Sequence, residues 1–179
     1  MTSQPSTGGD TAAGIGGESV GEDLKTAFRY HPAGIAVIAA ATPEGLVGLT
    51  ASSVASVAVD PAAIMFSVTR ATGSAGAILG ADTFVVNLID HDHAELALTF
   101  ATSGSARFTP EQGWGTLETG EPYLPGARAA LRCRTLHTVS VGSSTVVVAE
   151  VLEVRIGPIG RPVVYRDRVF HPLPDLIDQ

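Results

Sequence analysis

The chain has 179 residues, of which 45% are hydrophobic and 16% are charged, and its formal net charge is −7. This length fits one domain with a full core, and the negative charge argues against nucleic-acid or anionic-membrane partners. With one cysteine, no membrane-length apolar run and no secretory signal, the sequence predicts a cytoplasmic protein without disulfides or a cysteine-based metal site.

Residues 1–21 lack hydrophobic periodicity and are expected to form a disordered tail, so the predicted domain covers residues 22–179. Helical spacing predicts helices at three places, residues 22–31, 74–81 and 92–101. Pro32 ends the first helix, Ser74 opens the second, and an Asp92–Glu95 capping box starts the third. Strand patterns bounded by turn residues are predicted at 34–42, 46–59, 62–70 and 82–89.

Residues 102–126 are irregular, and three further strands are predicted at 128–141, 144–157 and around 162–170. Cys133 lies in the first of these and is interpreted as a small buried hydrophobic residue. At least six strands with only short helices and several hairpin-length connections predict a mainly antiparallel sheet, closed into a barrel. A doubly wound parallel fold would need a helix between nearly every pair of strands.

The stretch from Gly48 to Ser53 lacks the side-chain volume that strands normally use for packing. Either a neighbouring backbone approaches closely there, or a group that is not protein fills the space. A tight turn with locally bonded hydroxyls is the alternative, but the long apolar pattern favours a continuous strand with a flat slot for a planar heterocycle. Asn87, alone in an apolar strand, is a candidate donor to that ligand, although a core amide satisfied by backbone is the favoured interpretation.

Arg70, Thr72 and Ser74 occupy alternate positions where a strand ends and a helix begins. A helix N-terminus with free N–H groups, a guanidinium and two hydroxyls suits a phosphate group. On this segment alone, the favoured alternative is that Ser74 caps the helix and Arg70 is a surface residue.

The sequence contains no nucleophile motif, Walker loop or dinucleotide fingerprint, and its five histidines lack metal-ligand spacing. No metal site and no catalytic side chain is predicted. If the protein is an enzyme, a cofactor must therefore carry the reaction.

Six segments, covering about residues 24–172, resemble the flavin reductase-like domain: FRYHPAGIAVIAA, GLTASSVASVAVDPAAIMFSV, TFVVNLI, HAELALTFA, SARF and VVYRDRVF. Members of this family are small NAD(P)H:flavin oxidoreductases, which often supply reduced flavin to a partner monooxygenase. The resemblance implies a split β-barrel of the FMN-binding type that forms a homodimer, with FMN or FAD bound near the interface. It also implies hydride transfer from nicotinamide C4 to flavin N5, with backbone N–H groups stabilising the charge that develops on the ring.

The resemblance implies flavin-binding roles for thirteen residues besides Asn87. By this resemblance the ring would lie over Thr50, Ala51, Ser52 and Ser53, beside the strand end at Ser67 and Val68. The phosphate would lie near Arg70, Thr72 and Ser74. The outer part of the site is lined by Phe100, Ala101, Arg107 and Phe108, and Pro32 and Gly34 match the turn that precedes the barrel.

One segment departs from the family pattern on the nicotinamide side of the site. Where many members carry Gly-Asp-His, this chain has Gly142, Ser143 and Ser144. The departure predicts weakened or altered nicotinamide use. The predicted function is an NAD(P)H-dependent FMN reductase. Two alternatives are a flavin carrier or sensor without reductase activity, and a split-barrel enzyme that uses flavin or deazaflavin on another substrate.

Overall fold

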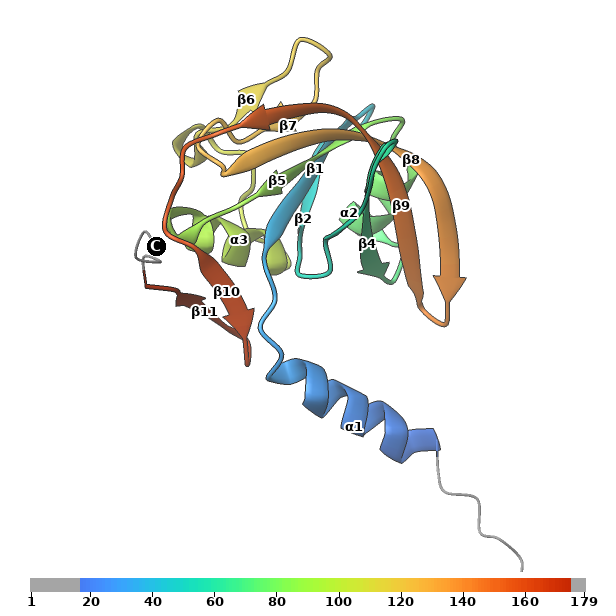
Figure 1. Cartoon of the computed structure of the whole chain (residues 1–179). Helices are drawn as coiled ribbons and strands as arrows, with labels where there is room; N and C mark the ends of the chain where they lie inside the picture. Colours follow the sequence, from blue (N-terminus) through green and yellow to red (C-terminus); the bar gives the residue numbers. More distant parts are fainter. Residues whose placement is uncertain (1–16, 175–179) are drawn as a thin grey trace, which may run out of the picture.

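Strands dominate the computed structural model, which describes residues 17–174 (Figure 1). Within these residues the helical elements are α1 (Gly17–Arg29), α2 (Gly73–Gly80), α3 (Ala94–Ala101) and the 3-10 turns η1 (His91–His93) and η2 (Pro110–Gln112). The strands are β1 (Ala36–Thr42), β2 (Gly45–Ala51), β3 (Ala55–Val59), β4 (Ala62–Thr69), β5 (Phe84–Leu88), β6 (Gly115–Thr116), β7 (Pro122–Tyr123), β8 (Ala129–Val141), β9 (Ser144–Ile156), β10 (Val163–Arg166) and β11 (Val169–Pro172). This content confirms the predicted mainly β fold with short helices.

One seven-stranded sheet forms the body, in the order β2-β1-β5-β8-β9-β4-β3, and every neighbouring pair is antiparallel. The sheet curves strongly around its core, as the bent ribbons of β8 and β9 show in Figure 1. Ile38, Phe66, Ile78 and Phe84 are fully buried inside this curve, with Ile78 contributed by α2. Among the described strands no ladder joins β2 to β3, so the sheet curls without closing.

The predicted continuous strand at 46–59 is wrong, because the chain leaves the sheet between Ala51 and Ala55. β2 pairs with β1 at one edge of the sheet, whereas β3 pairs with β4 at the other. The Ser53 hydroxyl replaces the lost ladder contacts: its Oγ accepts from the N–H of Ser67 at 2.9 Å and donates to the carbonyl of the same residue at 3.1 Å. A turn whose hydroxyls bond their own backbone is not present either, because the partner of Ser53 lies on β4; the stretch is the end of β2 followed by a bend.

The helix starts also differ from the prediction. α1 begins at Gly17 rather than at residue 22, and the rest of the predicted tail lies outside the described residues. The N-cap of α2 is Thr72, not Ser74, and it makes no side-chain capping bond. The Asp92–Glu95 capping box does not form, because a 3-10 turn places His93 at the N-cap of α3.

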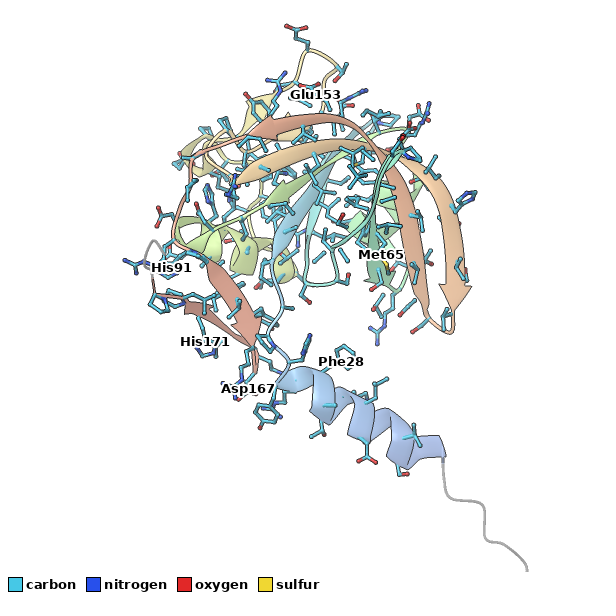
Figure 2. All side chains as sticks on the ribbon, viewed as in Figure 1. Phe28, Met65, His91, Glu153, Asp167 and His171 are labelled. Carbon is cyan, nitrogen blue, oxygen red and sulfur yellow. The ribbon has the colours of Figure 1, made fainter. Side chains whose placement is uncertain are left out.

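α1 projects away from the sheet and is joined to it near its C-terminal end (Figures 1 and 2). The Arg29 Nε lies 2.5 Å from Asp167 Oδ1, and the Asp167 N–H donates to the Arg29 carbonyl at 2.7 Å. No described helix is long and apolar enough to cross a membrane.

Two buried titratable groups, the Cys133 thiol and the Glu121 carboxyl, belong to the packing of the sheet and its adjoining loop. Cys133 is fully buried in the sheet, and burial raises the pKa of its thiol to about 12, as expected for a small hydrophobic core residue. Glu121 is buried and accepts hydrogen bonds from Thr83, Thr119 and Arg132. Burial alone would raise the pKa of this carboxyl, but the bonds to its charged form lower it to about 2.

Candidate flavin site

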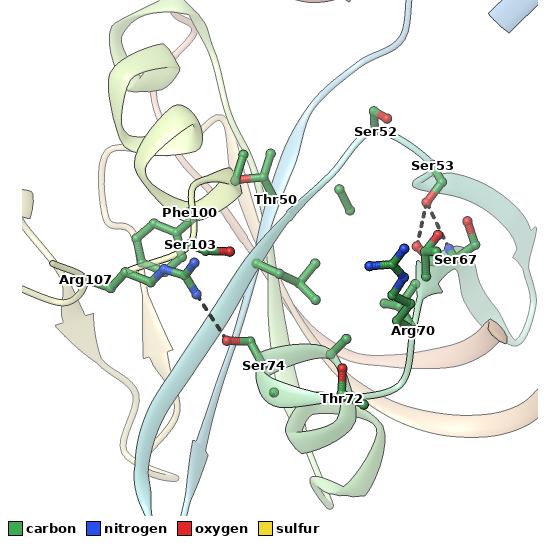
Figure 3. A pocket seen from close by; sticks show the side chains of 17 residues that line it. Thr50, Ser52, Ser53, Ser67, Arg70, Thr72, Ser74, Phe100, Ser103 and Arg107 are labelled. Atoms are coloured by element: carbon green, nitrogen blue, oxygen red, sulfur yellow. Dashed lines mark hydrogen bonds between the residues drawn. The ribbon is translucent and has the colours of Figure 1, made fainter. Parts of the chain in front are cut away.

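A cleft of about 690 Å³ lies between β2, the C-terminal end of β4, the first turn of α2 and the C-terminal end of α3 (Figure 3). Its size is that of a small-molecule site. The structure brings most of the predicted flavin-binding residues into its lining, namely Thr50, Ala51, Ser52, Ser53, Ser67, Val68, Arg70, Thr72, Ser74, Phe100, Ala101 and Arg107. Leu49, Thr69, Gly73, Ala75 and Ser103 also line the cleft, and the sequence carried no signal that singled them out.

The side chains at residues 48–53 are small for different physical reasons at different positions. A Cβ on Gly48 would lie 2.5 Å from Cε1 of Phe100, so this glycine is required for the close approach of an aromatic ring. Thr50 donates its hydroxyl to the Ala97 carbonyl at 2.5 Å and so ties β2 to α3. The Ala51 side chain belongs to the core, whereas Ser52 is exposed on the cleft wall. The predicted close approach of a neighbouring backbone is wrong at Gly48, because aromatic side chains approach there instead, whereas an open cleft lies beside Ser52.

Arg70 is the free cation of the cleft. Its backbone is left-handed, with φ of 57°, and its N–H donates to the Ser143 carbonyl at 2.8 Å, so the residue is fixed against the β8–β9 hairpin. Its guanidinium extends into the cleft (Figure 3) and has no ion-pair or hydrogen-bond partner among the described side chains. The N-terminal turn of α2 opens into the cleft at Thr72 and Ser74. The Thr72 N–H donates to the Arg70 carbonyl at 2.7 Å, whereas the first N–H groups within the helix have no intrahelical acceptor and carry partial positive charge.

Arg107, by contrast, is held by the protein. Its Nη1 donates to the Gly48 carbonyl at 2.9 Å and to Ser74 Oγ at 3.1 Å, and its Nη2 donates to the Thr102 carbonyl at 2.9 Å. The guanidinium also lies over the Phe100 ring, 5.4 Å from its centroid. No carboxylate of residues 17–174 lines the cleft, so Arg70 and Arg107 make it electropositive in an acidic chain.

Two predicted contacts are not at the cleft. Asn87 is fully buried, donates from Nδ2 to the Val37 carbonyl at 3.0 Å and accepts from the Leu124 N–H at 2.9 Å. Both ends of its amide are occupied by backbone, so the favoured interpretation of a core amide is confirmed and the candidate role as a ligand donor is wrong. Phe108 does not line the cleft either, because it packs behind Phe100, at a centroid distance of 5.1 Å, and against Trp114 at 4.8 Å.

The residues predicted on the nicotinamide side lie at the tight turn between β8 and β9, where Gly142 and Ser143 form the turn and Ser144 begins β9. Gly142 has φ of 58°, which suits the first position of a two-residue hairpin turn. Ser143 accepts from the Arg70 N–H, and Ser144 Oγ lies 3.4 Å from Thr69 Oγ1. They adjoin the cleft through these two contacts without lining it.

A second cleft of about 1080 Å³ shares Ser52, Ser53 and Ser67 with the first. It lies between α1, the β10–β11 hairpin and the turn that contains Pro32 and Gly34.

The residues of the first cleft fit a flavin mononucleotide. The small side chains leave room for a planar ring, and a free guanidinium with a helix N-terminus suits a phosphate. Within residues 17–174, no three His, Cys, Asp or Glu side chains gather in a way that could hold a metal ion.

Comparison with known proteins agrees with this geometry. The model of the flavin reductase-like domain matches residues 28–174. Over 157 residues the chain is 32% identical to the NADH:FMN oxidoreductase of Rhodococcus qingshengii, covering 85% of this chain and 82% of that protein. The crystal structure of a flavin reductase domain protein from Arthrobacter sp. FB24 matches with a TM-score of 0.80 at 30% identity, covering 89% of this chain and 98% of that one.

The styrene monooxygenase flavin reductase of Pseudomonas putida S12 matches with a TM-score of 0.75 at 26% identity, covering 85% of this chain and 97% of that one. Sequence and fold thus agree over nearly the whole described chain. The chain belongs to the flavin reductase-like domain family.

Proposed function

We propose that the protein is an NAD(P)H-dependent FMN reductase that supplies reduced flavin to a partner monooxygenase. The observation that carries this proposal is the electropositive cleft with its small-residue wall, in a chain similar to an NADH:FMN oxidoreductase. The similarity to the reductase of a styrene monooxygenase supports the monooxygenase partner. We propose the cytoplasm as its location, because a reaction that consumes NADH or NADPH needs a compartment that holds these nucleotides.

Bound flavin would supply the hydride-accepting ring. Arg70 and the N-terminal turn of α2 would hold its phosphate, and the Thr50–Ser53 segment would lie beneath the ring. Backbone N–H groups at the end of β2 would face the ring edge, where they stabilise developing negative charge without moving a proton. The nicotinamide would approach the ring from the side of the β8–β9 turn, where Ser143 and Ser144 lie.

The proposal is tested by anaerobic titration of the FMN-loaded protein with NADH and with NADPH. Loss of the visible flavin absorbance at one equivalent of either nucleotide is the expected result. A protein that binds FMN but is reduced by neither nucleotide would instead be a flavin carrier. The phosphate assignment has its own test, because Arg70→Ala should weaken FMN much more than riboflavin, and equal losses would contradict it.

We also propose that the protein is a homodimer. Val20, Leu24 and Phe28 follow one another at four-residue spacing on α1, and their exposed fractions lie between 58% and 66%. A 13-residue helix is marginal on its own, so an uncovered apolar stripe favours burial against a second copy. A monomeric mass in light scattering at micromolar concentration with FMN present would contradict this proposal.

A further inference from the structure

Two arginines line the first cleft, and the structure gives them different contacts. Arg70 has no partner among the described side chains and extends into the cleft. Arg107 donates three hydrogen bonds to protein atoms, and its buried Nε has no hydrogen-bond partner among the described residues. A guanidinium fixed at Gly48, Ser74 and Thr102 is not free to turn toward a ligand.

Of the three hydrogen bonds that Arg107 donates, the bond to Ser74 is the one whose acceptor lines the cleft. Arg107 Nη1 donates to Ser74 Oγ at 3.1 Å, and this bond is the dashed line at the lower left of Figure 3. A hydroxyl that accepts from a cation keeps its own O–H for donation, and the cation polarises that O–H. Ser74 lies in the first turn of α2 and lines the cleft, so its hydroxyl faces the same space as the helix N–H groups.

We infer that Arg107 is a positioning residue: it orients the Ser74 hydroxyl as a donor to the flavin phosphate, and Arg70 contacts that phosphate directly. The inference rests on the proposed function. Arg107 then acts on the phosphate only by orienting Ser74. Removing either residue should therefore remove the same contribution to the affinity for the phosphate.

The other contacts of Arg107 explain why an arginine is needed. Its planar fork reaches a carbonyl of β2, a hydroxyl of α2 and a carbonyl after α3 at the same time, and it covers the Phe100 ring. A lysine would keep the positive charge, but its single side-chain nitrogen cannot reach all three acceptors at the same time. Arg107→Lys therefore separates the orientation of Ser74 from the electrostatic effect of a positive charge.

The test compares FMN with riboflavin, which lacks the phosphate, in quantitative titrations of the full chain followed by Trp114 and flavin fluorescence. The preference of each variant for FMN over riboflavin is the measured quantity. Ser74→Ala and Arg107→Met should each lower this preference by about tenfold, the effect of one hydrogen bond to a charged group. The double variant should lose no more than the larger single loss. Arg107→Lys should behave like Arg107→Met.

The matched control is Arg128→Met, which removes the same charge from an exposed position away from the cleft and should leave the preference unchanged. A purely structural brace would weaken both ligands equally, and an unchanged preference in Arg107→Met would overturn the inference. Additive losses in the double variant would overturn it too, because Arg107 would then act independently of Ser74. A wild-type preference for FMN in Arg107→Lys would also overturn the inference, because a positive charge without the arginine fork would then be enough.

If Arg107→Met does not fold, Ser74→Ala and Arg107→Lys still decide the outcome. The wild-type protein separates this inference from the proposed function. A wild type that prefers FMN while the variants fail to show the coupled loss keeps the proposed function and rejects the role of Arg107. A wild type that does not distinguish FMN from riboflavin removes the phosphate site and this inference, whereas the anaerobic titration with NADH and NADPH decides the proposed function separately.

Discussion

Gly48→Ala is the smallest change that should damage the cleft. A Cβ at this position would lie 2.5 Å from Phe100 Cε1, 2.9 Å from Phe100 Cδ1 and 3.1 Å from Phe108 Cζ. Phe100 is 2% exposed and is held by Phe108 and Trp114, so its ring has no free space into which to move. The added methyl group must therefore displace the ring, the strand or both.

The cost follows from two opposing effects. Overpacking of a filled core costs about 1–3 kcal/mol, whereas replacing a strand glycine by alanine recovers about 0.5–1 kcal/mol of chain entropy. We expect a net loss of about 1–2 kcal/mol in the free energy of unfolding, measured by urea denaturation with Trp114 fluorescence. Because Phe100 lines the cleft and lies against Arg107, FMN should also bind about tenfold more weakly, a loss of about 1.4 kcal/mol.

Two further variants make this prediction specific. Phe100→Leu in the Gly48→Ala background should recover part of the lost stability, because the smaller side chain makes room for the methyl group. Gly21→Ala, a glycine in α1 with no atom within 4 Å of the added Cβ, should leave FMN affinity unchanged. A Gly48→Ala protein with wild-type stability and wild-type FMN affinity would refute the claim that the ring contact requires glycine.

Three other predictions concern single sites. The carboxyl of Glu121 has a pKa lowered from 4.5 to about 2, so the stability it confers is present above pH 4.5 and lost as the pH falls toward 2; urea midpoints of Glu121→Gln should lack this part of the acid dependence. Cys133, with its pKa raised to about 12, should resist alkylation by iodoacetamide in the native protein and react after unfolding, and rapid native labelling would contradict its burial. The double substitution Ser143→Asp and Ser144→His should lower KM for NADH or NADPH about tenfold with little change in kcat, and an unchanged KM would count against a nicotinamide role for this turn.

Local patterns predicted the mainly β fold because each strand carries its own apolar spacing. They failed at residues 46–59 because the apolar spacing continues across the break through Val54, Val57 and Val59. The break arises because β2 and β3 lie at opposite edges of the sheet. The sequence of a strand does not specify which other strand it pairs with. The resemblance to the family supplied most of the cleft residues, but not the turn that brings them together.

The errors within the site have the same origin. Asn87 was favoured as a core amide, but its candidacy as a ligand donor could not be dismissed from the sequence because its partner on the irregular segment, the Leu124 N–H, lies 37 positions away. Ser74 looked like a helix cap because its actual partner, Arg107, lies 33 positions away. Side chains whose partners are distant in sequence cannot be assigned from local motifs, even where the residue itself is correctly marked as important.

The cleft lies where the curled sheet fails to close, and its polar groups divide into two sets. Thr50, Ser53 and Arg107 bond to backbone and so fix the walls before any ligand arrives. Arg70 and the first turn of α2 keep their donors free and face the cleft. Binding to fixed walls avoids the cost of ordering them, so ligand affinity depends mainly on the free set. Substitutions in the wall set should therefore weaken FMN and riboflavin together, except where, as at Arg107, a wall contact also orients a free donor.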